Sequence, residues 1–267
     1  MAPHASLRAQ ILEGVIKVTA EEGDIMKLIA LDSSGLVASA AVLSDNELLA
    51  EYTVNYKKTH SQTLLPMLDE ISSMINLDLS EVDAVAVAAG PGSFTGLRIG
   101  SATAKGLGLA LGIPIIEVPT LAGLAYNLFD AKGLIVPCMD ARRKQVYNGI
   151  YRFEDHKLIT IMDQRPIAAA ELIDEICAME PWLTKEGVIF LGDGVPVIAE
   201  ESERLSVPYT YAPAHVGKQR AASVGALALV LYAEGRYVKA EEHAPIYLRK
   251  SQAEQERERR MAGKDSL

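Results

Sequence analysis

Apolar stretches separated by short polar turns predict a protein of alternating strands and helices. The apolar run MKLIALD ends in Asp32, and strands over 37–43 and from Leu48 follow it across Ser/Gly and polar turns. Residues 61–75 then change to helical spacing, which predicts an amphipathic helix. The chain therefore opens with three strands and a helix.

The same order of elements occurs twice. VDAVAVAAG and IPIIEV predict two more strands, with TGLRIGSATAKGLGLALG as a helix between them. From Lys132 a second apolar run ends in Asp140 and again leads into two strands, a helix over 170–179, the strand GVIFLGDG and a last helix, AASVGALALVLYAEG. Asp32 and Asp140 occupy matching places. We therefore expect an α/β protein with the duplicated ribonuclease-H-like fold of actin-like ATPases, in two lobes.

These patterns divide the chain into four parts. Residues 1–25 are an N-terminal extension that precedes the first strong strand pattern, although SLRAQILEGVIKVTAEEGD has the spacing of a short amphipathic helix. The first lobe covers 26–131 and the second covers 132–248. The mixed-charge segment 249–267 contains hardly any apolar residues and predicts a solvated or disordered tail.

Composition excludes some classes of function. The net charge of −9 and the pI near 5.1 argue against a chain that binds nucleic acid alone, because phosphate neutralisation requires clustered Lys and Arg. The most apolar run, 106–125, is interrupted by Pro114, Glu117 and Pro119, so no membrane span is predicted. Residues 1–25 lack the pattern of a signal peptide. We therefore expect a cytoplasmic protein with no membrane partner.

The stretch GPGSFTGLRIG at 90–100 resembles a phosphate loop at first sight. It matches neither common glycine-rich phosphate motif, and Pro91 removes one of the amides that would bind an anion. Ser93 or Thr95 would cap the following helix with or without a ligand. The stretch therefore favours a tight turn between strand and helix.

Asp32 and Ser33 are the candidates for a nucleotide site, because this fold places carboxylates and small hydroxyls near a bound nucleotide. Asp140 is instead followed by ARRKQVY, which lacks the glycine that would let the backbone approach a phosphate. No two of the five histidines have the i, i+4 spacing of a helical metal site, and there is no GxSxG motif. We therefore predict no catalytic residue, no metal ligand and no cofactor of the chain's own.

The helix over 95–111 carries a stripe of small residues at Gly96, Gly100, Ala104 and Gly108. Each interior glycine costs a helix about 1 kcal/mol relative to alanine, and close approach of a second helix is the usual compensation. That second helix belongs either to the same lobe, at 64–75, or to another polypeptide.

Several of these motifs together resemble one family. HSQTLLPMLDEI, GPGSFTGLRIG, MDARRKQVY and APIYLRK occur in an order similar to that of the TsaB (YeaZ) family, the accessory subunits of bacterial tRNA threonylcarbamoyladenosine synthesis. The resemblance covers about 26–250. It implies a degenerate, non-catalytic relative of the transferase TsaD, because the positions of TsaD's metal-binding histidines fall on Thr120 and Leu124 here and that of its aspartate on 221–223.

The resemblance also implies partners. TsaB proteins bind TsaD through two helices of the first lobe, here 61–75 and 95–111. The ATPase TsaE joins at that junction, where ATP or ADP can bind, and tRNA is reached only through the complex. A homodimer is expected when TsaD is absent. The predicted interface residues are Leu64, Met67, Leu68, Ile71, Gly96, Gly100, Ala104 and Gly108.

Two other functions remain open from the residues. A small-molecule kinase or ATPase of the same fold group is favoured by Asp32 and the glycine turns, and would require nucleotide in the cleft between the lobes. A metallopeptidase would require clustered His, Asp and Glu ligands, which the sequence does not offer.

Overall fold

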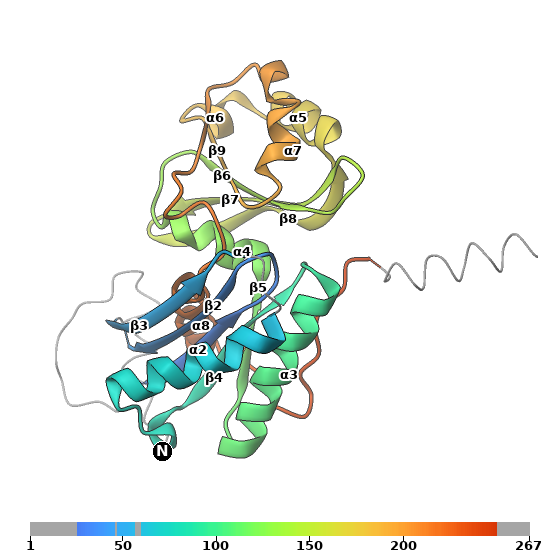
Figure 1. Ribbon diagram of the computed structural model, residues 1–267. Coiled ribbons are helices and arrows are strands. Elements are labelled where there is room, and N and C mark those ends of the chain that lie inside the picture. The colour runs from blue at the N-terminus through green and yellow to red at the C-terminus, as the bar shows by residue number, and fades with distance from the viewer. Residues whose placement is uncertain (1–25, 46, 57–59, 250–267) are drawn as a thin grey trace, which may run out of the picture.

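The chain forms two lobes, each built on a five-stranded sheet (Figure 1). The computed structural model describes residues 26–45, 47–56 and 60–249. The predicted extension over 1–25 and the predicted tail beyond Arg249 lie outside these residues. Among the helices described, none is long and apolar enough to cross a membrane.

The first sheet has the strand order β3-β2-β1-β4-β5. Strands β1 to β3 are antiparallel neighbours, whereas β4 and β5 run parallel to β1. All residues of β4 are buried, as its continuous apolar run predicts. The strands are β1 (Lys27–Asp32), β2 (Ala38–Ser44), β3 (Glu47–Val54), β4 (Ala84–Gly90) and β5 (Ile115–Pro119).

The second sheet repeats this plan in the order β10-β9-β6-β7-β8. Strand β6 takes the place of β1, with two antiparallel neighbours on one side and two parallel strands on the other. The predicted duplication is confirmed, and Asp32 and Asp140 end equivalent strands. The strands are β6 (Leu134–Asp140), β7 (Gln145–Glu154), β8 (Lys157–Ala168), β9 (Val188–Leu191) and β10 (Tyr209–Tyr211).

The helices form the outer layers and a central layer between the lobes (Figure 1). Helices α2 and α3 cover one face of the first sheet, and α5 and α7 cover one face of the second. The α-helices are α2 (His60–Ile75), α3 (Phe94–Leu111), α4 (Thr120–Ala125), α5 (Ala169–Cys177), α6 (Pro181–Thr184), α7 (Val195–Ala199) and α8 (Ala221–Ala233). Three short 3-10 helices lie at Leu79–Glu81, Tyr126–Leu128 and Ser202–Arg204.

One hydrophobic core joins the two lobes. It contains residues of both sheets, such as Leu28 and Ile135, together with Leu227 of α8. All six residues of α4 are buried in or beside it. The lobes are thus two copies of one topology that share a core.

The predicted C-terminal boundary of the second lobe, at 248, is wrong. Helix α8 packs on β1, β2 and β5 of the first lobe, and the following segment forms a β-bridge between Val238 and Ile115. Residues 221–249 therefore belong with the first lobe. The sequence does not reveal this return, because α8 is apolar around most of its circumference and would fit against either sheet.

The shared core predicts that the first lobe cannot fold from its N-terminal half alone. In a fragment of residues 26–131 the face of the first sheet that carries Leu28 and Ala30 would lose α8, so we expect no cooperative thermal transition by circular dichroism. A fragment of residues 26–249 keeps α8 and is the control, for which we expect a cooperative transition. Cooperative unfolding of the shorter fragment would contradict the shared core.

Candidate functional site

Helix α3 begins and ends with well-defined caps. Ser93 is the N-cap, and its Oγ accepts a hydrogen bond from the Gly96 amide at 3.3 Å. Gly112 ends the helix in the left-handed conformation, with φ of 70°. The predicted turn between strand and helix is confirmed, and Ser93 rather than Thr95 is the cap.

The small-residue stripe of α3 faces the protein's own interior. A side chain at Gly96 would collide with the Ser33 carbonyl oxygen, and one at Gly100 would lie 2.6 Å from Ser33 Oγ. Ala104 is fully buried, and a side chain at Gly108 would lie 2.9 Å from the Ala240 Cβ. The close approach that the glycines permit is thus with the β1–β2 turn and the C-terminal segment.

The predicted interface residues of α2 are also internal. Leu64, Met67, Leu68 and Ile71 are each at most 5% exposed and pack against the first sheet. The prediction that these eight residues of α2 and α3 lie on the surface is therefore wrong. The spacing correctly located the apolar face of each helix, but an apolar face is buried first against the nearest sheet of the same lobe.

A different set of residues on the same two helices faces solvent. We call these exposed small and apolar residues the outer α2–α3 face: Leu65 and Met74, on opposite flanks of α2, and Ala102, Gly106, Leu109 and Ala110 on α3. Ala102, Gly106 and Ala110 repeat the four-residue spacing two positions after the buried stripe, which rotates them about 200° around the helix.

Three large apolar side chains of α2 and α3 are exposed on this face. Met74 is 77% exposed, Leu65 is 56% exposed and Leu109 is 50% exposed. A Cβ added to Gly106 would meet no atom within 4 Å. The second stripe is visible in the sequence once the first is assigned to the core. Small and apolar exposed residues on two neighbouring helices are typical of a surface that receives another helix.

A polar cleft of about 1020 Å³ lies between the lobes. The first lobe contributes Gly35, His60 and the start of α3, and the second contributes Asp140, Asp193 and the turn that contains Arg142 and Arg143. Arg142 pairs with Asp140 at 3.1 Å. Residues 142–144 all have left-handed backbone conformations, with φ of 66°, 56° and 58°. The positive charge of this turn would attract an anionic group. The turn is not a glycine hairpin of the kind that binds phosphate.

The two predicted nucleotide residues do not line this cleft. Asp32 is 1% exposed, and its Oδ1 accepts hydrogen bonds from Ser34 N at 2.9 Å and Ser34 Oγ at 2.6 Å. Ser33 Oγ donates to the Gly96 carbonyl at 2.9 Å. Burial raises the pKa of Asp32 to about 6 despite the hydrogen bonds from Ser34, and burial likewise raises the pKa of Asp193. Both predicted residues hold the β1–β2 turn in place.

The positions that the resemblance assigns to lost metal ligands have structural contacts. Thr120 Oγ1 accepts a hydrogen bond from the Gly90 amide at 3.0 Å, and Leu124 packs in the shared core. The first amides of α8, at Ala221 and Ala222, donate to Ser39 Oγ and Glu51 Oε1. Within the described residues no three His, Cys, Asp or Glu side chains gather as a metal site would require. The absence of a metal stays a prediction.

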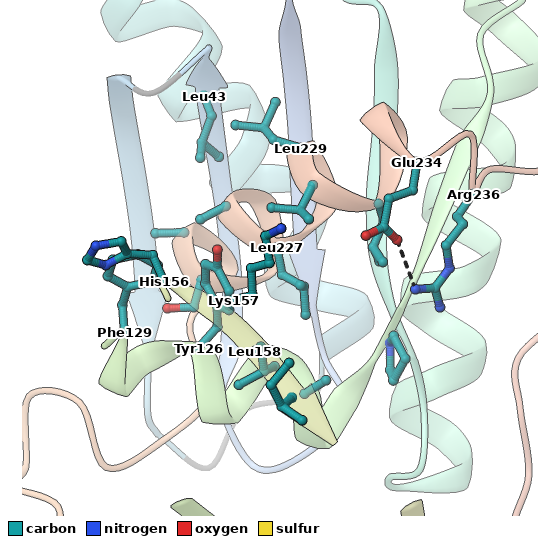
Figure 2. A pocket seen from close by; sticks show the side chains of 18 of the residues that line it. Leu43, Tyr126, Phe129, His156, Lys157, Leu158, Leu227, Leu229, Glu234 and Arg236 are labelled. Atoms are coloured by element: carbon teal, nitrogen blue, oxygen red, sulfur yellow. Dashed lines mark hydrogen bonds and ion pairs between the residues drawn. The ribbon is translucent and has the colours of Figure 1, made fainter. Parts of the chain in front are cut away.

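A second cavity, of about 920 Å³, opens between α8 and the start of β8 (Figure 2). Leucines from three elements, Leu43, Leu158 and Leu227, project toward it in Figure 2. Two pairs of polar groups contact each other at its rim, since His156 contacts Asp130 at 3.0 Å and Arg236 contacts Glu234 at 3.3 Å. The cavity is therefore a mainly hydrophobic space between the lobes.

Comparison with known proteins gives a consistent picture. The family model of TsaD, tRNA N6-adenosine threonylcarbamoyltransferase, matches residues 47–257. The tRNA threonylcarbamoyladenosine biosynthesis protein TsaB of Bacillus subtilis is 34% identical over 167 residues, which are 62% of this chain and 71% of that protein. TsaB of Escherichia coli is 27% identical over 244 residues, or 85% of this chain and 96% of that protein. The solved structure of YeaZ from Pseudomonas aeruginosa superposes with a TM-score of 0.70 at 28% identity, over 84% of this chain and all of that one.

The two glycine stripes of α3 predict opposite effects of the same substitution. Gly96→Ala places a Cβ against the Ser33 carbonyl and should lower the free energy of unfolding by about 3 kcal/mol. Gly106→Ala adds a Cβ in open space and should raise it by about 1 kcal/mol through helix propensity. Urea unfolding of both variants measures the difference. Equal effects would mean that the rotation of α3 is wrong.

The buried Asp32 predicts a pH-dependent stability. Its pKa rises from 3.8 in the unfolded chain to about 6, so the folded state binds the proton more tightly and loses stability as the pH rises through this range. Asp32→Asn keeps an acceptor for Ser34 without the charge, and at pH 7.5 it should be more stable than the original chain by about 3 kcal/mol. At pH 4 the two should differ little.

Urea unfolding at both pH values measures this effect. Asp69→Asn, on the exposed side of α2, is the matched control and should leave the pH profile unchanged. A stability difference between Asp32→Asn and the original chain that is independent of pH would contradict the assignment.

Proposed function

Because this chain belongs to the TsaB (YeaZ) family, we propose that it is a non-catalytic subunit that binds and activates the transferase TsaD. With TsaE, the complex would transfer threonylcarbamoyl to N6 of adenosine 37 in tRNAs that read codons starting with A. The support for a role in this modification is the similarity to proteins named for threonylcarbamoyladenosine biosynthesis, which extends over most of the chain.

The outer α2–α3 face is the observation that carries the proposed binding role. It presents exposed apolar side chains on α2, Met74 and Leu65, and the open helix surface at Gly106 on α3. Burying such side chains against a partner helix contributes about 25 cal/mol for each Å² of apolar area removed from water. A second helix pair of the same fold would fit this surface, which supports TsaD as the partner and a second copy of this chain when TsaD is absent.

The proposed lack of catalysis is supported by what occupies the equivalent catalytic positions. Thr120 and Leu124 are fully committed to hydrogen bonding and packing inside the fold. The chain would therefore act through its partner, and tRNA would be reached only through the complex, in the cytoplasm. The net charge of −9 fits a subunit that leaves tRNA binding to another chain.

We further propose that any ATP or ADP bound by the complex lies at the junction with TsaD and TsaE. Asp32 and Ser33 use their polar atoms within the β1–β2 turn, which supports a site outside this chain's own cleft. Calorimetry with Mg-ATP on the isolated chain separates this from the kinase alternative, since tight binding with turnover would favour a kinase.

The binding role predicts a specific effect of bulk at Gly106. Gly106→Leu should leave the fold intact, because no atom lies within 4 Å of the new Cβ, and should weaken binding to TsaD at least about tenfold. The dissociation constant is measured by calorimetry with purified TsaD. Ala199→Leu, on an exposed position of α7 in the second lobe, is the control and should bind normally.

Reconstituted tRNA modification gives the second readout. Omitting this chain should abolish modification, and adding Gly106→Leu should restore much less of it than Ala199→Leu does. Unchanged affinity of a folded Gly106→Leu protein would show that the outer α2–α3 face is not the binding surface. Full modification without the chain would contradict the activating role.

A further inference from the structure

A buried hydrogen-bonded chain of three side chains connects segments that are far apart in the sequence. His243 Nε2 lies 2.8 Å from Ser101 Oγ on α3, and His243 Nδ1 lies 2.7 Å from Glu117 Oε1 on β5. The His243 side chain is fully buried, whereas that of Glu117 is 29% exposed. Since a carboxylate only accepts, Nδ1 carries a proton, and Nε2 shares a hydrogen bond with the serine hydroxyl.

The connectivity is that of a serine hydrolase triad, but the surroundings differ. Ser101 lies inside α3, so the neighbouring amides are engaged along the helix and do not point at a substrate oxygen. Ser101 is 8% exposed, and none of the three residues lines either cavity of the described chain. The geometry lacks both space for an acyl group and donors for an oxyanion.

The position of His243 in the chain suggests another role. It lies in the middle of a segment, 238–249, that we call the strap. At its start Val238 pairs with Ile115, and in the middle Lys105 Nζ donates to the Glu241 carbonyl at 2.8 Å. Ala240 packs against α3 in the core of the first lobe.

The far end of the strap crosses to the second lobe. The Ile246 amide donates to the Ala89 carbonyl at 2.7 Å, and the Tyr247 ring packs against the Phe94 ring in a tilted arrangement, with the ring centroids 4.7 Å apart. Arg249 then donates to the Ala141 carbonyl at 2.9 Å and to Gln145, both in the second lobe. Residues 246–249 form one wall of the polar cleft.

We propose that the strap is a clamp that holds the two lobes at a fixed separation across the mouth of the cleft, and that the Ser101–His243–Glu117 chain fastens it. His243 lies between Val238, which pairs with β5, and Arg249, which contacts the second lobe. Removing the imidazole leaves the hydroxyl and the carboxylate without their buried partner, which loosens the strap from the first lobe. The cleft can then open without any change in α3 or β5.

Hydrogen exchange and a distance measurement test the clamp on the full chain. In His243→Ala we expect the Ile246 amide, which donates to the Ala89 carbonyl, to exchange at least about tenfold faster than in the original protein. Spin labels at Ser73→Cys on α2 and Glu186→Cys in the second lobe, in a Cys177→Ser background, should give a broader and longer distance distribution. Both label positions are exposed.

Three further variants separate the clamp from general destabilisation. Ser101→Ala should behave like His243→Ala and replaces it if that variant does not fold. Glu117→Gln keeps an acceptor for Nδ1 and should retain most of the protection. Glu242→Ala, the exposed neighbour of His243, is the matched control and should change nothing.

Faster exchange with an unchanged distance distribution would overturn the clamp, because the strap would then have only a local role. Unchanged exchange in a folded His243→Ala or Ser101→Ala protein would overturn the fastening. Labelling of Ser101 by a fluorophosphonate probe would overturn the structural assignment and identify a reactive serine instead.

Discussion

The close approach of the β1–β2 turn to α3 is the contact on which the rest of the first lobe depends. The Ser33 carbonyl lies where a side chain of Gly96 would be, and the Ser33 hydroxyl donates to the carbonyl of the same residue. Such an approach is possible only for glycine, because any Cβ would overlap with the turn. The contact fixes how α3 is rotated, and with it which residues of the helix reach the solvent.

That rotation separates the two roles of α3. Its inner stripe holds the β1–β2 turn, and the hydrogen bonds between Asp32 and Ser34 complete this turn from within. Its outer stripe, with Ala102 and Gly106, is exposed to solvent. One helix thus explains both why the glycine-rich stretch resembles a phosphate loop and why we propose a binding rather than a catalytic role.

The duplicated lobes do not behave as independent halves. The core that contains α4 and α8 is built from both sheets, and the strap returns along α3 before it reaches the second lobe. Helix α3 contacts the strap on one side, and in the proposed complex it would contact the partner on another.

The sequence by itself determined most of the elements, the duplication and a helix cap at Ser93 or Thr95, because these follow from periodicity, turn residues and local hydrogen bonds. It also placed Asp32 and Asp140 at equivalent strand ends. It missed the short elements α6, α7 and β10. It could not decide which stripe of α3 is buried, since both Gly96 to Gly108 and Ala102 to Ala110 have helical spacing. The sequence also did not predict that α8 packs on the first sheet, or that His243 contacts Ser101, 142 residues away. Those facts depend on contacts between distant segments, which only the tertiary structure selects.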